Sequence, residues 1–204
     1  MMYCPPAFAE SRTEIMAELI RANPLGLLIT SGESGPDANP VPFNLTPDGR
    51  YLRTHLARAN PQLTDLAAGV PALIVFQGEQ AYVSPDWYPS KHETGRAVPT
   101  WNYLMVQIRG DVSLSEDTGW LRNQIETMTH QMEAARPTPW AVSDAPDKYI
   151  TLQLRGIIGV EVDIREMRGK WKASQNKAVP DRVGVGNALR ATHPALSTVT
   201  HGVT

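Results

Sequence analysis

Short apolar runs separated by turn-forming residues recur along this chain of 204 residues, and they limit its fold more than any other feature. Proline, present at 17 positions, exceeds its usual share of about 5% and favours loops and edge strands over long regular elements. Pro47-Asp48-Gly49 is a strong turn signal between two such runs. Many short strands at hairpin-like spacings favour an antiparallel barrel over a doubly wound parallel sheet.

The pattern of apolar residues predicts the individual elements. The expected strands are residues 25–30, 40–45, 51–56, 71–77, 81–84, 101–109, 112–114 and 157–164. The expected helices are residues 11–23, 61–68, 115–132 and 181–190, with a capping box of Ser11 and Glu14 on the first and a Ser115 cap on the third. We predict a mostly β fold with helical decorations, in one domain over residues 1–190. Residues 191–204, rich in Thr, Ser, His and Gly, predict a flexible tail.

The composition is that of an ordinary globular protein, with 42% apolar and 20% charged residues. The single cysteine, Cys4, can form no internal disulfide, and no window approaches the roughly 18 to 20 apolar residues of a membrane span. We therefore expect a cytoplasmic protein. A formal net charge of -2 gives no overall attraction for nucleic acid, so any DNA-binding role would need a local basic patch.

Several familiar site motifs are absent from the sequence. Gly184 and Gly186 resemble the start of a dinucleotide fingerprint, but the third glycine is missing and too little chain follows. No Walker loop, zinc-type cysteine pair, His-Glu-x-x-His or Gly-x-Ser-x-Gly motif occurs. The five histidines are scattered without ligand-like spacing, so we expect no metal site, although a haem ligand stays open.

Residues 55–62 leave a predicted strand and enter a predicted helix. Backbone N–H groups at such a point, together with the charge-assisted donors of Arg58, can bind a phosphate. The alternative is that Asn60 only caps the helix and Arg58 is a solvated surface charge. The residues alone do not favour one of these interpretations.

Two further segments combine aromatic or cationic side chains with polar ones. Residues 82–91 and 98–103 could enclose a planar ring, or they could form an aromatic corner of the core stiffened by prolines. Residues 168–177 interleave four cations with a tryptophan and three hydrogen-bonding side chains. That segment suits nucleic acid or an anionic cofactor, or else it is a solvated charged loop.

Taken together, five blocks of the chain resemble one known family. They are Met2 to Phe8, His55 to Gln62, Tyr82 to Pro85 with Trp87-Tyr88, Val98 to Tyr103, and Gly169-Lys170 with Ser174 to Lys177. Occurring in family order across nearly the whole chain, they resemble the PaiB family. The resemblance implies a pyridoxamine-phosphate-oxidase-like, FMN-binding split β-barrel that forms a homodimer, with flavin sites at the subunit interface.

The resemblance also implies which residues bind FMN. Thr54, His55, Leu56 and Ala57 would lie along the flavin, with Arg58, Asn60 and Gln62 near its phosphate. The pocket would be closed by the remaining blocks, whose candidate residues are Lys91, Trp101, Asn102, Lys170, Ser174 and Gln175.

Members of the PaiB family are described as negative transcriptional regulators of sporulation and degradative-enzyme genes. The resemblance therefore implies a regulator, although we find no helix-turn-helix and only the 168–177 cations to contact DNA. The alternative is an FMN-dependent oxidoreductase acting on a small molecule. Because the cofactor would supply most of the chemistry, such an enzyme would leave few catalytic residues to recognise, and we assign none. Ligand sensing without flavin, or haem handling, is a third class.

Overall fold

The computed structural model describes residues 2–202, and the chain divides into two compact units. The first unit comprises the chain up to Asn23, Phe76–Gln107 and the chain from Met167 onward. The second unit comprises Pro24–Val75 and Ile108–Glu166. The single domain expected over residues 1–190 stays a prediction.

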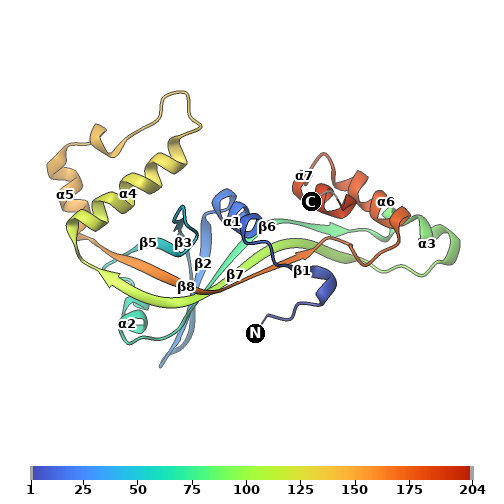
Figure 1. The fold of residues 1–204 in the computed structure, drawn as a ribbon, viewed down its shortest axis with the longest axis horizontal. Helices are drawn as coiled ribbons and strands as arrows, with labels where there is room; N and C mark the ends of the chain where they lie inside the picture. The colour runs from blue at the N-terminus through green and yellow to red at the C-terminus, as the bar shows by residue number, and fades with distance from the viewer. Residues whose placement is uncertain (1, 203–204) are drawn as a thin grey trace. The chain divides into compact units, whose positions relative to one another are not determined.

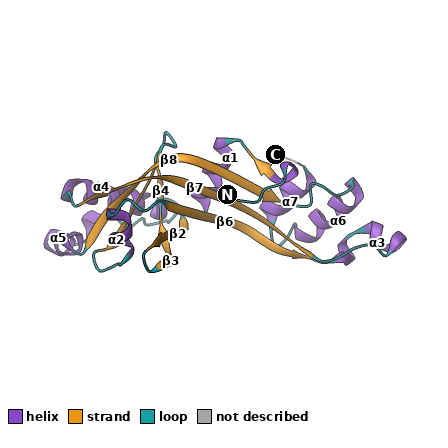
Figure 2. Ribbon diagram, turned by 90° about the horizontal axis from the view of Figure 1, so that it is seen from below, coloured by secondary structure: helices purple, strands orange, loops and turns teal. Residues whose placement is uncertain are grey.

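One antiparallel sheet of eight strands is the main element of the fold (Figures 1 and 2). Neighbouring strands follow the order β3-β2-β6-β7-β8-β5-β4, and β1 also pairs with β8. The strands are β1 Ala9–Glu10, β2 Leu25–Gly32, β3 Gly35–Pro42, β4 Asn44–Leu45, β5 Tyr51–Ala57, β6 Ala72–Val83, β7 Thr100–Ser115 and β8 Ile157–Lys172. Strands β6, β7 and β8 each contribute residues to both units.

Two long strands replace expected pairs of short ones. Residues 71–77 and 81–84 belong to one strand, β6, and residues 101–109 and 112–114 belong to β7, so the expected breaks were wrong. Each expected break contains a glycine, Gly78 or Gly110. A Cβ on Gly110 would lie 2.3 Å from the Asp163 carbonyl oxygen, and one on Gly78 would lie 3.1 Å from Leu19 Cδ1. Both glycines therefore allow a close approach within the fold and do not form turns.

In the second unit, β2 and β3 form a hairpin in which Leu25 pairs with Pro42, which confirms the predicted pairing for residues 40–42. The rest of the expected strand 40–45 was wrong, because Asn44 and Leu45 form β4 and pair with β5. Strand β5 pairs with β8 from Tyr51↔Asp163 to Ala57↔Ile157. The inward side chains of β5 alternate regularly: Leu52, Thr54 and Leu56 are buried, as the pleat of a strand requires.

The helices of the second unit are α2 Gln62–Ala67, α4 Thr118–Glu133 and α5 Asp147–Arg155, together with the short 3-10 turn Val142–Asp144. Helices α4 and α5 lie side by side (Figure 1) around a small core of Leu121, Val142, Ile150 and Leu154. The predicted Ser115 cap was wrong. Asp117 caps α4 instead, because its carboxylate accepts the Trp120 N–H at 2.6 Å.

In the first unit, α1 (Thr13–Ala22) buries Met16, Ala17, Leu19 and Ile20. The predicted capping box does not form. The residue before the helix, Arg12, donates instead from its backbone N–H and its guanidinium Nε to the Glu10 carboxylate, at 2.8 and 2.9 Å. Glu10 lies in β1, whose pairing with β8 places Ala9 opposite Lys170. A 3-10 turn, Pro6–Phe8, precedes β1.

The remaining elements of the first unit are the 3-10 turn Pro85–Trp87 and the helices α3 Pro89–Thr94, α6 Val179–Leu189 and α7 Pro194–His201. Helices α6 and α7 pack together (Figures 1 and 2). Helix α7 differs from the flexible tail expected after residue 191, because Leu196 and Thr200 are buried and the Arg182 guanidinium donates to the Thr200 and His201 carbonyls. Residues 203–204 of that tail lie outside the described residues.

Within residues 2–202, no helix is long and apolar enough to cross a membrane. The same part of the chain contains no group of three or more His, Cys, Asp and Glu side chains that could hold a metal ion.

Candidate functional site

The structure distributes the predicted flavin residues over both units. Thr54 to Arg58, Asn60 and Gln62 belong to the second unit, on β5, the turn after it and the start of α2. Lys91, Trp101, Asn102, Lys170, Ser174 and Gln175 belong to the first unit. The candidate site residues therefore fall into two groups, one in each unit.

In the second unit, β5 directs alternate side chains to its two faces. The buried Thr54 hydroxyl donates to the Pro42 carbonyl at 2.6 Å, and Leu56 is part of the core. His55 points to the opposite face. Its Nδ1 is buried and has no hydrogen-bond partner among the described residues, and burial lowers the pKa of the imidazole. A buried nitrogen without a partner is the kind of group that a bound ligand can satisfy.

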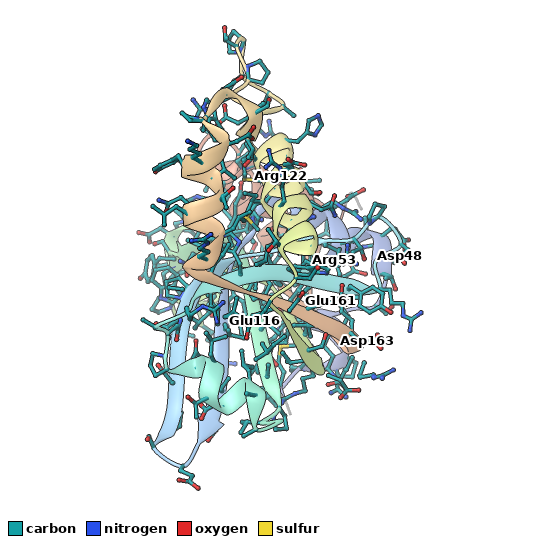
Figure 3. All side chains as sticks on the ribbon, turned by 90° about the vertical axis from the view of Figure 1, so that its left-hand side faces the viewer. Asp48, Arg53, Glu116, Arg122, Glu161 and Asp163 are labelled. Carbon is teal, nitrogen blue, oxygen red and sulfur yellow. The ribbon has the colours of Figure 1, made fainter. Side chains whose placement is uncertain are left out.

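Helix α4 covers the sheet beside His55. His55 pairs with Gly159 on β8, and directly opposite residues of an antiparallel pair share a face. A Cβ on Gly159 would lie 2.3 Å from the Trp120 ring of α4. Arg53 lies two residues before His55, stacks over Trp120 with its guanidinium 5.9 Å from the ring centre, and pairs with Glu161 at 2.6 Å (Figure 3).

Gln124 adds further polar atoms to the buried part of α4. It follows Trp120 by one helical turn and is 2% exposed. Both its amide nitrogen and its amide oxygen lack a partner within residues 2–202. The sequence showed it only as a polar residue inside an amphipathic pattern, so sequence reasoning missed it.

The turn after β5 uses most of its side-chain donors internally. Arg58 pairs with Glu116 at 3.0 Å and donates to the Arg155 carbonyl at 3.2 Å. The Asn60 side chain accepts the Gln62 N–H at 3.0 Å, so the cap of the alternative interpretation is present. Ala57 and Arg58 are exposed. A phosphate at this turn would compete with Glu116 for Arg58.

Gln62 is a buried structural residue in this arrangement, with 1% of its surface exposed. Its amide oxygen accepts from Asn39 at 3.0 Å, and its amide nitrogen donates to the Leu28 and Asp37 carbonyls at 3.2 and 3.3 Å. The side chain therefore holds α2 against the β2–β3 hairpin. Its predicted role near the flavin phosphate stays a prediction.

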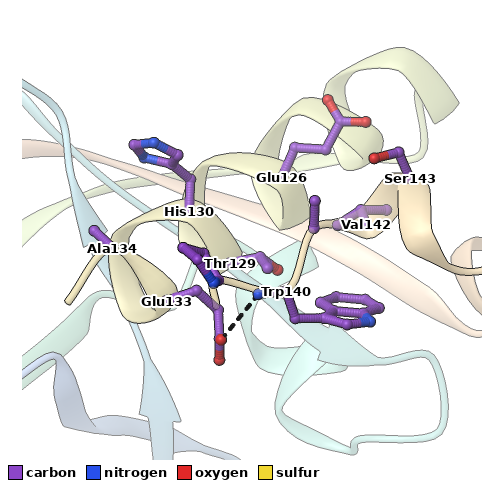
Figure 4. Close-up of a pocket in the computed structure, with 10 residues that line it drawn as sticks. Glu126, Thr129, His130, Glu133, Ala134, Trp140, Val142 and Ser143 are labelled. Atoms are coloured by element: carbon purple, nitrogen blue, oxygen red, sulfur yellow. Dashed lines mark hydrogen bonds between the residues drawn. The ribbon is translucent and has the colours of Figure 1, made fainter. Parts of the chain in front are cut away.

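A cavity of about 410 Å³ adjoins Arg58 in the second unit. Its lining combines the ion pair with apolar side chains of α2 and the ends of β7 and β8. The lining residues are Arg58, Leu63, Thr64, Ala67, Leu114, Glu116 and Ile158. A second cavity, of about 380 Å³, lies at the end of α4, where the Trp140 N–H donates to Glu133 (Figure 4). None of the predicted flavin residues lines the second cavity.

In the first unit, three lysines near the end of β8 form what we call the lysine cluster: Lys170, Lys172 and Lys177. Lys170 is buried and donates to the Tyr3 carbonyl at 2.8 Å. Its ammonium also lies 5.4 Å from the ring centres of Tyr3 and Tyr103. Contacts of this length are attractive cation–π interactions.

Lys172 is the central member of the lysine cluster. Its ammonium donates to the Thr100 hydroxyl at 2.6 Å and to the Trp101 carbonyl. Burial, and then the positive charges of Lys170 and Lys177, lower the pKa of Lys172. Neither Lys172 nor Lys177 was among the predicted site residues. The alternating cations of residues 168–177 were the sequence signal that could have found them.

Lys177 lies beside a buried phenol. Its ammonium is 5.2 Å from the ring centre of Tyr88, which is 2% exposed. Burial raises the pKa of Tyr88, and the charge of Asp181 adds to this effect. Asp181 is itself held by Ser90, whose N–H and hydroxyl donate to its carboxylate at 3.0 and 2.8 Å.

The turn that follows β8 connects the lysine cluster to Asn102. Ser174 adopts a left-handed backbone with φ of 63°, which a residue with a side chain rarely does. Asn102, fully buried, donates to the Ser174 hydroxyl at 3.0 Å. Gln175 closes the turn, because its side chain accepts the Ala173 N–H at 2.7 Å and donates to the Trp171 carbonyl. Asn102, Ser174 and Gln175, all predicted site residues, are thus brought together.

Trp101 and Lys91 have more exposed positions in the first unit. Trp101 is 54% exposed and meets Tyr82 edge-to-face, with ring centres 6.1 Å apart. Lys91, in α3, pairs with Asp86. The ring of Trp101 is free to contact a planar ligand, whereas Lys91 already has a carboxylate partner.

Comparison with known proteins identifies the family. Residues 2–166 match the family model described as "Putative FMN-binding domain". The chain is 37% identical to an uncharacterized protein, AN0679, of Emericella nidulans, over 90% of this chain and 88% of that protein. It is 30% identical to the "Protease synthase and sporulation protein PAI 2" of Bacillus subtilis, over 93% of this chain and 89% of that protein.

Solved structures of low sequence identity share the fold. The FAD and heme binding protein of Mycobacterium smegmatis matches with a TM-score of 0.59 at 19% identity, over 79% of this chain and 71% of that chain. The sheet is therefore a split β-barrel of the pyridoxamine-phosphate-oxidase-like class, which confirms the predicted fold class. The resemblance to the PaiB family is confirmed as well, and the chain belongs to the family of flavin-binding split-barrel proteins described as "Putative FMN-binding domain".

Proposed function

We propose that this protein is a cytoplasmic FMN-dependent oxidoreductase that acts on a small molecule. The observation that supports it most is the match of residues 2–166 to the FMN-binding family, which includes the β5 segment and its turn. Bound FMN would supply electron transfer to and from the substrate. The protein would have to bind the flavin, orient it and tune its surroundings.

The residues of the second unit suit such a cofactor. Arg58 is a fixed cation at the edge of a cavity of about 410 Å³, and a phosphate can replace its partner Glu116. His55 offers a buried nitrogen that lacks a partner among the described residues. We assign the phosphate to Arg58 and the N–H groups of its turn, and a polar edge of the flavin to His55.

Arginine pairing favours an enzyme over a DNA-binding protein. Eight arginines pair with carboxylates, which cancels the charge that these eight residues would offer to a phosphate backbone. The pairs are Arg12–Glu10, Arg50–Asp163, Arg53–Glu161, Arg58–Glu116, Arg109–Glu166, Arg122–Glu126, Arg136–Glu133 and Arg165–Asp111.

The phosphate assignment can be tested by equilibrium dialysis with FMN and with riboflavin, which lacks the phosphate. We expect the protein to prefer FMN by at least about tenfold, as one charge-assisted contact would give. Arg58→Ala should lose most of this preference. Arg136→Ala, which removes another exposed arginine of the second unit, should keep it. Equal binding of FMN and riboflavin by the unaltered protein would refute the assignment.

The redox assignment has its own test. Under anaerobic conditions, reduced nicotinamide should bleach the visible absorption of the FMN-loaded protein, and air should restore it. A flavin spectrum that no reduced nicotinamide changes would exclude these donors and count against the proposed oxidoreductase.

Regulation of transcription is the second candidate, and one observation favours it. The relative that covers 93% of this chain is named for protease synthesis and sporulation in Bacillus subtilis. A regulator should retard promoter fragments in a gel, with an affinity that falls steeply as salt rises. If the protein fails to retard promoter fragments even at low salt, direct regulation is excluded.

A further inference from the structure

The lysine cluster is a concentration of positive charge without carboxylate partners. Among the described residues, none of Lys170, Lys172 and Lys177 forms an ion pair with Asp or Glu, whereas arginines throughout the chain do. Asp181, the carboxylate near Tyr88, accepts two hydrogen bonds from Ser90 instead. Three neighbouring cations in one partly buried place repel one another unless an anion joins them.

Neutral groups hold the three ammonium groups in place. Carbonyl and hydroxyl oxygens accept from Lys170 and Lys172, and the aromatic faces of Tyr3, Tyr103 and Tyr88 lie against the cluster. These contacts orient the lysines but leave their charge uncompensated. Burial lowers the pKa of Lys172 most, and the positive charges of Lys170 and Lys177 lower it further.

The turn after β8 adds backbone donors beside the lysine cluster. In the described part of the chain, the N–H groups of Ser174, Gln175 and Asn176 have no acceptor. The left-handed backbone of Ser174 is maintained by Asn102 and by the side chain of Gln175. Consecutive free N–H groups around a left-handed residue can form a concave site for an anion. A strained residue that its neighbours hold in place is also typical of functional sites.

The flavin phosphate is assigned to Arg58 and its turn, which belong to the second unit, whereas the lysine cluster and the turn after it belong to the first unit. The resemblance predicted Lys170, Ser174 and Gln175 as flavin residues, and we now assign a different ligand to this segment. We propose that the lysine cluster and the N–H groups of residues 174–176 bind the carboxylate or phosphate of a small anionic molecule, distinct from the flavin phosphate. This inference rests on the proposed function. The anionic molecule is the substrate, so the oxidoreductase acts on an organic anion.

Inorganic phosphate can probe the site in the full-length, FMN-loaded protein at constant ionic strength. We expect saturable shifts of the backbone amide NMR signals of residues 174–176. The double variant Lys172→Gln, Lys177→Gln should weaken phosphate binding by at least about tenfold, as the loss of charge-assisted contacts predicts. It should leave FMN affinity unchanged. Lys148→Gln, which removes an exposed lysine of α5, should bind phosphate like the unaltered protein.

Three outcomes distinguish this proposal from its alternatives. Absence of saturable shifts in the FMN-loaded protein would overturn it. If the double variant loses FMN affinity but keeps riboflavin affinity, the lysines hold the flavin phosphate and the proposal is again wrong. If the protein binds no flavin, and phosphate gives the same saturable shifts in the flavin-free protein, the anion site stands and the proposed function fails.

Discussion

At the scale of single residues, His55 has a direct consequence for stability. Burial lowers the pKa of its imidazole below the value of about 6.5 expected in the unfolded chain. Below pH about 6.5, the unfolded state therefore binds more protons than the folded state, so stability falls as the pH falls. Above that pH, both states hold a neutral imidazole and this effect vanishes.

We predict that His55→Gln removes this part of the pH dependence. Urea unfolding at about pH 7.5 and about pH 5 should show a smaller loss of stability for His55→Gln than for the unaltered protein. His130→Gln, which replaces an exposed histidine of α4, serves as the control. Between about pH 7.5 and about pH 5 it should lose as much stability as the unaltered protein. Equal losses for both variants would show that His55 is not protonated differently on folding.

Asn102 has a second residue-scale consequence. Asn102→Ala leaves the buried Ser174 hydroxyl without its partner, and an unsatisfied buried polar group costs about 1–3 kcal/mol. We expect the midpoint of urea unfolding to fall accordingly. Asn123→Ala, at an exposed position of α4, should change stability by no more than about 0.5 kcal/mol. If Asn102→Ala loses as little stability as this control, Asn102 does not support the turn at Ser174.

Some of these residues could be predicted from the sequence and others could not. The alternation that buries Thr54 and Leu56 can be read from the sequence, because it depends only on neighbouring residues along one strand. The network around Gln62 joins residues more than 20 positions apart, and the contacts of Lys172 with Thr100 and Trp101 join separate strands. Such pairings depend on the register of the sheet, which no local pattern fixes.

At the scale of elements, the packing of α4 on β8 depends on Gly159. A Cβ at this position would lie 2.3 Å from the Trp120 ring, so Gly159→Ala must displace the helix or the ring. Overpacking of this kind costs about 1–3 kcal/mol, and we expect that loss in the free energy of unfolding.

A double-mutant cycle separates this clash from a general effect of the added methyl group. Once Trp120→Ala has removed the ring, Gly159→Ala should cost less than it does in the unaltered protein. Gly119→Ala lies on α4, where a Cβ would lie 3.3 Å from the Asp117 side chain, and should be near neutral. Additive losses in the cycle would show that Gly159 does not contact α4 in this way.

The sequence predicted most elements but misplaced several boundaries. Strands with clear alternation, such as β2 and β5, and the amphipathic helices α1 and α4 lie where expected. Helix α5 was missed because only Ile150 and Leu154 of its apolar positions are buried. Helix α7 was missed because residues 191–204 as a whole are rich in Thr, Ser, His and Gly. Both gain their stability from packing that a short local pattern does not reveal.

At the scale of the whole molecule, we predict a homodimer. The resemblance implies flavin sites at a subunit interface, and Leu25 and Leu27 on β2 are 64% and 38% exposed. Exposed apolar side chains on one strand suit an interface between copies. Sedimentation at micromolar concentration should give twice the chain mass of 22.4 kDa. A mass of one chain, with or without FMN, would contradict the shared site.

Flavin binding is the central claim, and the visible absorption spectrum tests it most directly. The purified protein is mixed with excess FMN, passed through a desalting column and measured again. We predict that it keeps a flavin spectrum, in an amount close to one FMN per chain, and that Arg58→Ala keeps much less. A protein that leaves the column colourless after incubation with FMN would contradict the account.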